Sequence, residues 1–382
     1  MSKVYFKNLN GIRFILAALV LLHHVAVVMQ VCEISNIYQK IGALKAFGPV
    51  AVSLFFTLSG FLITYLLLIE REQSQTISLR TFYIARAKRI LPIYYLIVIL
   101  HLYILPHTPL YAFESKLLLV DVSTYNYSTL VLPEWSINLW YFILLPQVAL
   151  AIMVASGNAF VPAGHVWSIG VEEIFYFLYP ILLKKYAHKF KKFILLLIAL
   201  YYIISIFIFI GAYCSKSALI TNTLFSRILN FSIIMIIYNR INCMFIGAIA
   251  AYLLFKKHAL LIKVTKPAVF YSSIIGIIFL FAIGARVPFL TYEVYCLLFV
   301  CILLYFIHNN IHTFLEHPLL VYLGKISYGI YMYQMIAIFF TVYLYKLGYI
   351  NIFFIFLISF LITIILSAIS FELIEKRIMK KR

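Results

Sequence analysis

The sequence predicts an all-α integral membrane protein, a polytopic bundle of about ten transmembrane helices. Hydrophobic residues make up 65% of the 382-residue chain and charged residues 11%, against about 45–50% and about 25% in an ordinary globular protein. So few charges cannot cover a water-facing surface. Each crossing takes about 20 apolar residues. We therefore expect residues 1–382 to form a single transmembrane domain with no appended soluble domain.

The first apolar run, Ile12 to Gln30, predicts a permanent span. A signal peptide is the alternative, but no small-residue cleavage site follows the run, and further spans come after it. The run also carries Arg13, His23 and His24, which a disposable signal does not need.

Basic clusters predict the topology, because cytoplasmic loops carry an excess of Lys and Arg. The formal net charge of +19 thus indicates basic loops rather than a nucleic-acid surface. Both termini are expected in the cytoplasm of a bacterial-type inner (cell) membrane. The clusters lie at 70–89, 184–192, 256–266 and 376–382, and the further clear spans lie near 47–69, 90–106, 193–213, 228–255, 268–285, 292–307, 327–345 and 353–373.

One stretch does not fit simple alternation of loops and spans. Between the third span and the cluster at 184–192 the chain must cross an odd number of times, yet 138–155 and 171–183 are both apolar. We expect one of the two to be re-entrant or interfacial, which membranes tolerate where protein or a cavity covers the backbone. The polar interval 107–137 is expected to face outward.

The five cysteines are odd in number and show no CxxC pair. Most lie in apolar runs, so we interpret them as packing residues and draw no conclusion about redox compartment.

Several ionisable residues lie inside the predicted spans, where each costs at least about 2.5–3.5 kcal/mol on insertion scales. His23 and His24 lie about 17 Å into the first span at 1.5 Å per residue. Imidazole is the side chain best suited to accept a proton near neutral pH. Interhelical hydrogen bonding for packing is the alternative reading.

Arg86, Lys88 and Arg89 lie where the third span meets the cytoplasmic side. The i, i+3 spacing of the arginines puts both guanidiniums on one helix face, where they can bind phosphates bidentately. Simple positive-inside anchoring explains any one of these residues equally well.

Glu172 and Glu173 precede an apolar run in the segment HVWSIGVEEIFYFLYP. The two carboxylates are suited to acid/base work or to pairing with a buried arginine. An acidic cap on a helix N-terminus is the alternative, because the helix dipole favours it.

Arg240 has about ten apolar or small residues on each side and needs an anionic partner or a wet cavity. We expect it to pair with Glu172 or Glu173. The nearby small residues Gly247, Ala248 and Ala250 are interpreted as helix-packing residues, and so are Ser59 and Gly60 in FFTLSGFLI.

The ordered set of segments resembles membrane acyltransferase family 3, whose best-known members O-acetylate bacterial O-antigen and related envelope glycans. The resemblance runs from residue 9 to 377. Its segments are LNGIRFILAALVLLHH, SLFFTLSGFLI, FYIARAKRILPIYY, HVWSIGVEEIFYFLYP, RINCMFIGAIAA, LGKISYGIYMYQ and FELIEKR. Each segment is weak alone, but their order is specific.

The resemblance implies roles for individual positions. It implies that His24, paired with Arg13 across the Arg-x10-His pattern, is the catalytic base or transient acyl carrier, with His23 secondary. It implies that Arg86 and Arg89, beside Lys88, bind acyl-CoA. The remaining matches, with catalytic, substrate-binding or structural roles, are Trp167, Ser168, Glu172, Glu173, Arg240, Ser327, Tyr328 and Tyr331.

Three positions depart from the family pattern. Asn10 and Asn242 stand where the family usually has acids, and Gln334 ends the late motif where a His is usual. Glutamine can hydrogen-bond an acceptor but cannot relay a proton, which puts in doubt any role that needs a second imidazole there.

The residues and the resemblance predict a membrane-embedded acyltransferase. We expect it to move an acyl group, acetyl by resemblance, from cytoplasmic acyl-CoA to a hydroxyl of an envelope glycan or lipid-linked sugar. His24 either activates the hydroxyl for direct attack or carries the acyl group as acyl-histidine. The implied partners are acyl-CoA, the acceptor and membrane lipids, with no metal and no nucleic acid.

A transporter or flippase of lipid-linked sugars is the alternative from another class, because it also places charges at the midplane. No inverted repeat is visible, which disfavours it. A purely structural subunit is disfavoured by the cost of Arg240, His23 and His24.

Overall fold

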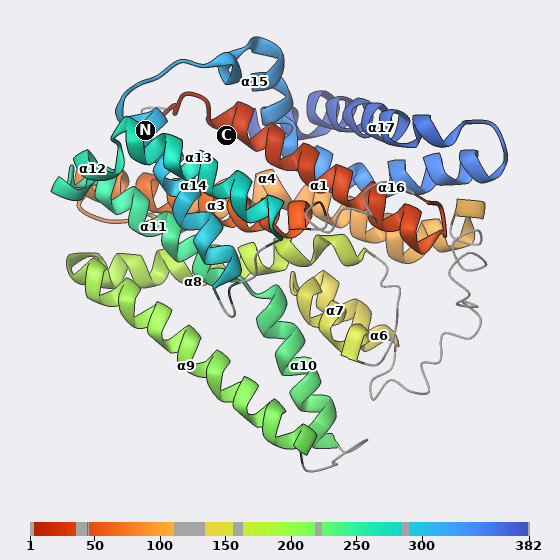
Figure 1. Ribbon diagram of the computed structural model, residues 1–382, viewed down its shortest axis with the longest axis horizontal. Coiled ribbons are helices and arrows are strands. Elements are labelled where there is room, and N and C mark those ends of the chain that lie inside the picture. The colour runs from red at the N-terminus through yellow and green to blue at the C-terminus, as the bar shows by residue number, and fades with distance from the viewer. Residues whose placement is uncertain are drawn as a thin grey trace.

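The protein is a bundle of helices (Figure 1). The computed structural model describes residues 4–35, 44, 46–110, 134–155, 163–217, 224–284, 287 and 290–380. Within these residues every regular element is helical and no strand occurs, so the predicted all-α fold is confirmed. The predicted polar interval 107–137 falls largely on residues outside these ranges.

Eight segments of the described chain are long and apolar enough to cross a membrane, which makes this a multi-pass membrane protein. One segment holds two helices, α8 (Trp167–Tyr186) and α9 (Phe190–Ser217), which meet at a 3-10 turn and diverge (Figure 1). Another holds α10 (Leu224–Tyr238) and α11 (Ile241–Phe255), which break at Asn239–Arg240. The others centre on α1 (Leu9–Val31), α3 (Phe47–Ser74), α4 (Leu79–Ile99), α14 (Thr291–His308), α16 (Ser327–Lys346) and α17 (Ile355–Ser370).

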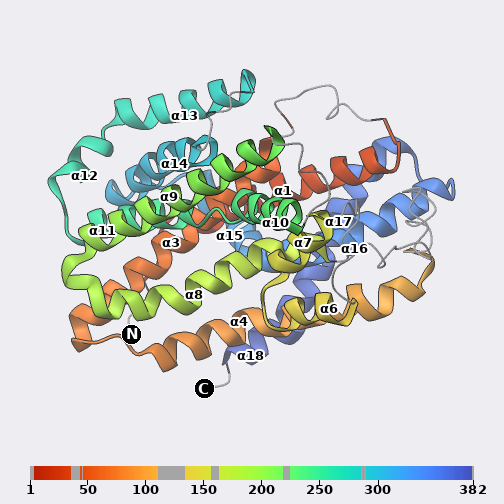
Figure 2. The same ribbon diagram turned by 90° about the horizontal axis from the view of Figure 1, so that it is seen from below.

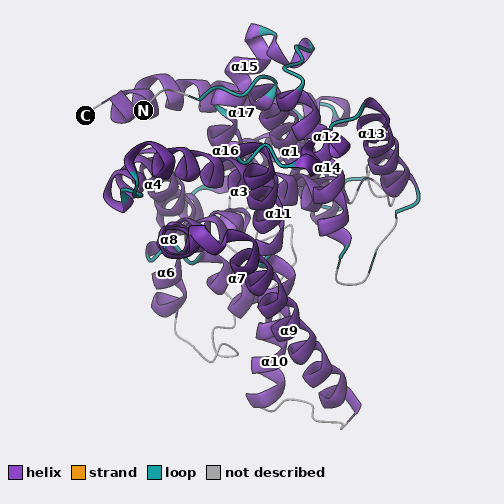
Figure 3. Cartoon of the chain, turned by 90° about the vertical axis from the view of Figure 1, so that its left-hand side faces the viewer, coloured by secondary structure: helices purple, strands orange, loops and turns teal. Residues whose placement is uncertain are grey.

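Shorter helices complete the bundle. The apolar α13 (Pro267–Ala282) has 16 residues and occupies the span predicted at 268–285. The helices α12 (Ala259–Val264), α15 (Pro318–Lys325) and α18 (Lys376–Lys380) are shorter still. Figure 3 shows α9 and α10 extending away from the rest of the bundle.

The two apolar candidates at 138–155 and 171–183 have different structures. The first forms two short helices, α6 (Glu134–Phe142) and α7 (Pro146–Ala155), separated by a turn in which Leu144 has φ 63°. At 1.5 Å per residue α7 is about 15 Å long, half the hydrocarbon thickness. The second lies inside α8, whose 20 residues are long enough to cross. The segment too short to cross is therefore α6–α7.

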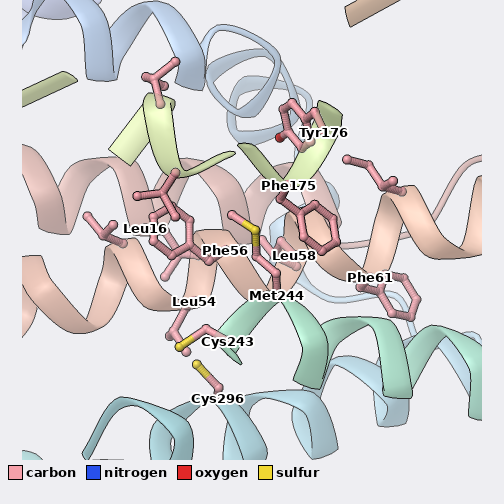
Figure 4. Close-up of a cluster of buried hydrophobic side chains, with 14 of the residues drawn as sticks. Leu16, Leu54, Phe56, Leu58, Phe61, Phe175, Tyr176, Cys243, Met244 and Cys296 are labelled. Carbon is pink, nitrogen blue, oxygen red and sulfur yellow. The ribbon is translucent and has the colours of Figure 1, made fainter. Parts of the chain in front are cut away.

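Helix α3 lies at the centre of the core and contacts α1, α8, α11 and α14. Figure 4 shows Phe56 and Leu58 of α3 near Phe175 of α8 and Met244 of α11. Cys243 of α11 and Cys296 of α14 are buried free thiols beside this cluster, in agreement with their interpretation as packing residues.

Two glycines let the backbones of α3 and α11 touch. A Cβ added at Gly60 would meet the carbonyl oxygen of Met244, and one added at Gly247 would meet that of Thr57. The packing roles expected for Gly60 and Gly247 are therefore supported by the geometry.

The start of α1 is fixed by the segment that precedes α15. The Asn8 amide donates to the Ile311 carbonyl at 2.7 Å and accepts from the Thr313 hydroxyl at 2.8 Å. Both chain ends lie close together at the same end of the bundle (Figure 2). These contacts fix how far Arg13, one turn further along α1, lies from that end of the bundle.

We predict that Gly247→Ala lowers the thermal stability of the detergent-solubilised protein. The added methyl group forces α3 and α11 apart, and overpacking of this kind costs about 1–3 kcal/mol, against about 1 kcal/mol gained in helix propensity. The matched control is Gly211→Ala in α9, where the nearest atom is Leu229 Cδ1 at 3.6 Å. A Tm for Gly247→Ala equal to or above that of the control variant would contradict the close approach.

Candidate functional site

A cavity of about 270 Å³ with a mixed polar and apolar lining lies between α1, α3, α4, α8 and α16. It brings together segments that are far apart in the sequence and that all carry predicted site residues. Its polar lining consists of Arg13, Ser59, Arg86, Arg89, Ser168, Glu172, Tyr176, Ser327, Tyr328 and Tyr331.

Three arginines give this cavity its charge. Within the described part of the chain, the guanidiniums of Arg13, Arg86 and Arg89 form no ion pair and no hydrogen bond. The Arg86 Cζ lies 5.3 Å from the ring centroid of Tyr176 and 5.6 Å from that of Phe82. Aromatic faces thus hold Arg86 while its N–H donors stay available to an anion.

A second pocket of about 410 Å³ adjoins the cavity and shares Arg86 and Arg89 with it. It adds Lys88, Glu70, Gln73 and Thr81 to the lining. Val4 and Met379, near the two chain ends, also line it. The predicted cluster of Arg86, Lys88 and Arg89 is therefore assembled at the junction of two pockets, at the end of the bundle that holds both termini.

Glu172 and Glu173 lie in different surroundings. The Glu172 carboxylate accepts hydrogen bonds from Ser59 Oγ at 2.9 Å and from Tyr176 OH at 2.6 Å, and it lines the cavity. Glu173 is not part of the cavity lining, because neighbouring helical residues point about 100° apart. Since α8 begins at Trp167 and has no acidic residue in its first turn, the alternative reading of both glutamates as helix caps is wrong.

Ser59 was expected to be a packing residue, and in the structure it also lies at the cavity wall. It lines the cavity and donates to Glu172. Its neighbour Gly60 faces α11, where an added Cβ would meet the Met244 carbonyl, so Ser59 faces a different helix, α8.

His24 lies in α1 with Nδ1 3.1 Å from Gln334 Oε1 in α16. The Gln334 Nε2 donates to the Tyr331 carbonyl at 2.9 Å, which leaves Oε1 as an acceptor. His24 Nδ1 must therefore carry the hydrogen, and the lone pair is on Nε2. The His23 side chain points in a different direction from that of His24, since its ring lies against Gly48 of α3.

The remaining α16 residues tie this helix to its neighbours. Ser168 Oγ and Tyr331 OH are 2.7 Å apart at the cavity wall, and Tyr331 OH also donates to the His165 carbonyl. Tyr328 OH donates to the Ile90 carbonyl at 2.9 Å. Ser327 Oγ is buried and lines the cavity without a hydrogen-bond partner among the described residues.

The predicted pairing of Arg240 with Glu172 or Glu173 is wrong. Its Nη1 donates to the Pro49 carbonyl at 2.7 Å and to Ser53 Oγ at 3.3 Å, and its Nε donates to the Ile237 carbonyl. Its Cζ lies 3.7 Å from the ring centroid of Tyr292 and 5.7 Å from that of Trp167. The Ile237 carbonyl lies next to the break between α10 and α11, and the Pro49 carbonyl lies in α3, so hydrogen bonds and aromatic faces replace the expected carboxylate.

We predict that Arg240→Met lowers stability and leaves the cavity lined by Arg13, Arg86 and Arg89 intact. The change removes charged hydrogen bonds worth about 1.5–3 kcal/mol each between the α10–α11 break and α3. Thermal unfolding in detergent should show a lower Tm, whereas Arg80→Met, an exposed residue of α4, should leave it unchanged. An unchanged Tm for Arg240→Met would contradict this structural role.

Comparison with known proteins identifies the family. Residues 6–372 match the sequence profile described as an acyltransferase domain, of the third acyltransferase family. O-acetyltransferase OatA of Staphylococcus aureus (strain NCTC 8325 / PS 47) is 27% identical over 354 residues, covering 87% of this chain and 53% of its own. OatA of strain COL gives the same values.

A further protein of Staphylococcus aureus strain COL, with a provisional O-acetyltransferase name, is 26% identical over 353 residues, covering 86% of this chain and 52% of its own. The chain thus spans about half the length of the curated relatives it matches. No solved structure gives a significant match. Since the profile match covers nearly all of the chain, the protein belongs to membrane acyltransferase family 3, the family that its motifs resemble.

Proposed function

We propose that the protein transfers an acyl group, acetyl in the first instance, from cytoplasmic acyl-CoA to a hydroxyl of an envelope glycan or lipid-linked sugar. The O-acetyltransferase names of its relatives support a hydroxyl acceptor. The basic clusters support a bacterial-type inner membrane location with both termini in the cytoplasm.

The observation that carries the proposal is the charge of the cavity. Arg13, Arg86 and Arg89 line it, and none has an ion-pair partner within the described ranges. Guanidiniums held in a low-dielectric bundle need an anion, and phosphate matches their geometry. Acyl-CoA offers phosphates on a long arm that ends in a thioester.

The two adjoining pockets suggest how the donor lies. We assign its nucleotide end to the pocket lined by Lys88, Glu70 and Gln73, and its phosphates to Arg86 and Arg89 at the junction. The arm then runs along the cavity toward Ser168 and Tyr331. Neither His24 nor Gln334 is part of the cavity lining, but Gln334, which contacts His24, donates to the carbonyl of the lining residue Tyr331. We assign the thioester to this side of the cavity.

His24 Nε2 supplies the reactive lone pair in either of two routes. In direct transfer it takes the proton from the acceptor hydroxyl, whose oxygen attacks the thioester carbon. In the covalent route Nε2 attacks that carbon, the thiolate leaves, and the acyl group then passes to the acceptor oxygen. Gln334 positions the imidazole in both routes by accepting the Nδ1 hydrogen.

Glu172 is assigned to the cavity itself. Its carboxylate, held by Ser59 and Tyr176, offsets the charge of the arginines and is placed for acid/base work next to the donor arm. A catalytic role for Glu173 rests on its motif alone, since it does not line the cavity.

Radiolabelled acetyl-CoA incubated with membranes containing the protein tests the proposal. Label should pass to the glycan fraction, and mass spectrometry of glycans from cells with and without the gene should show an added acyl mass. A flippase would leave the thioester intact, so an uncleaved thioester would contradict the proposed function.

We predict that replacing Arg86 and Arg89 together by Lys weakens acyl-CoA binding about 10-fold or more, because lysine keeps the charge but loses the bidentate fork. Equilibrium binding of a non-hydrolysable acetyl-CoA analogue to purified protein measures the effect. Arg80→Lys, on the same helix but outside both pockets, is the matched control. Wild-type affinity in the double Lys variant would contradict phosphate binding and would show that the arginines only anchor the helix at the cytoplasmic side.

We predict that His24→Ala abolishes transfer in a protein that still inserts and binds acyl-CoA. Gln334→Leu, which removes the acceptor for Nδ1, should lower kcat about 10–100-fold with KM for acetyl-CoA unchanged, as for other groups that orient a functional imidazole. Steady-state kinetics in proteoliposomes measure both. An active His24→Ala variant together with an inactive His23→Ala variant would reverse the assignment of the two histidines.

A further inference from the structure

Two more histidines are buried near the end of the cavity. His165 lies in the 3-10 turn Gly164–Val166 before α8, and His101 lies in the π-helical turn Leu100–Ile104 after α4. Their exposed fractions are 6% and 1%, and their ring centroids are 5.2 Å apart. Buried imidazoles carry a desolvation cost, and π-helical turns are frequent at functional sites.

The hydrogen bonds of His165 determine which of its nitrogens is basic. Its Nε2 lies 3.3 Å from the Met332 carbonyl oxygen. A carbonyl only accepts, so Nε2 carries the hydrogen and Nδ1 carries the lone pair. The backbone at this position is fixed as well, because the Tyr331 hydroxyl donates to the His165 carbonyl.

His165 and His24 are held by the same turn of α16. The carbonyl of Tyr331 accepts from Gln334, which orients His24, and the next carbonyl, that of Met332, accepts from His165. Consecutive carbonyls of one helix therefore set the positions of two imidazoles, each with one nitrogen that can accept a proton.

The covalent route needs a second base at this place. If Nδ1 keeps its hydrogen and its bond to Gln334, acylation of His24 Nε2 gives a positively charged acyl-imidazolium, whose ring has no lone pair left. The acyl-histidine then cannot accept a proton from the acceptor hydroxyl. A neighbouring imidazole can, and it contributes typically about 10²–10⁴-fold as a general base.

We propose that His165 is this second catalytic imidazole, the general base that takes the proton of the acceptor hydroxyl while His24 carries the acyl group. The inference rests on the proposed acyl transfer. The acceptor oxygen forms its bond to the acyl carbon, the bond from that carbon to His24 Nε2 breaks, and the hydroxyl proton goes to His165 Nδ1. The thiolate released in the first step takes up one proton from water, and His165 returns one to water.

The arrangement gives donor and acceptor different approaches to the acyl group. Ser168 and Tyr331 line the donor cavity and are bonded to each other, and His165 adjoins Tyr331, with ring centroids 6.1 Å apart. His165 itself is not part of the cavity lining. Because His165 lies outside that lining, the proposal requires the acceptor hydroxyl to approach the acyl group from the His165 side.

The test uses His165→Gln in the full chain in proteoliposomes. The glutamine amide keeps a donor for the Met332 carbonyl but cannot act as the base. With radiolabelled acetyl-CoA, transfer to a cell-envelope glycan fraction should fall about 100-fold or more. Transfer to hydroxylamine, a nucleophile that needs no general base, should stay at the wild-type rate, which also shows that the variant is folded and uses the donor.

The outcomes separate this inference from the proposed function. Equal losses with glycan and hydroxylamine, or no loss with either, would overturn the role of His165. His317→Gln, an exposed histidine before α15, is the control and should match the wild type. If the wild type itself cleaves no acetyl-CoA, the proposed function fails, and the role of His165 falls with it.

Discussion

Unpaired positive charge inside an apolar bundle is the constraint on which the site depends. A guanidinium in a membrane-spanning helix is costly unless something compensates it, and Arg13, Arg86 and Arg89 have no carboxylate or carbonyl partner in the described structure. The Glu172 carboxylate lines the same cavity and accepts from Ser59 and Tyr176, so one negative charge faces three positive ones. The remaining positive charge favours water or an anion in the cavity, in accord with the proposed anionic donor.

Arg240 is a buried arginine of the same protein whose positive charge is compensated by hydrogen bonds and aromatic rings of the chain itself. It is 7% exposed and donates to Pro49, Ser53 and Ile237, with Tyr292 and Trp167 against its charge. It joins the α10–α11 break to α3 and needs nothing from outside the chain. The same residue type thus has two roles, and the difference lies in whether acceptors of the chain reach the guanidinium. Arg240 finds the Ile237 carbonyl next to the helix break and the Pro49 carbonyl of α3, whereas Arg86 and Arg89 have no such acceptor among the described residues.

The spans were predictable because the length of an apolar run is a local property, and α1, α3 and α16 occur where the sequence places them. The ordered motifs singled out Arg13, Arg86 and Glu172 one by one, but only the structure shows that they line one cavity. The partner of Arg240 and the role of Ser59 depend on tertiary contacts that no local pattern encodes. Gln334 cannot relay a proton, so the sequence alone indicated no clear role for it. The structure shows that its side chain contacts both His24 and the Tyr331 carbonyl, and these two hydrogen bonds orient the His24 ring.

The central claim is that one site, extending from the Arg86–Arg89 pair to His24, holds the acyl donor. A structure of the protein with a non-hydrolysable acyl-CoA analogue tests it most directly. We expect the phosphates within hydrogen-bond distance of Arg86 and Arg89, about 2.7–2.9 Å for charged pairs. We expect the carbon that replaces the thioester carbonyl within about 3–3.5 Å of His24 Nε2, the separation of a near-attack geometry. An analogue bound elsewhere, or one whose reactive end stops short of the Ser168–Tyr331 pair with no path to His24, would contradict the account.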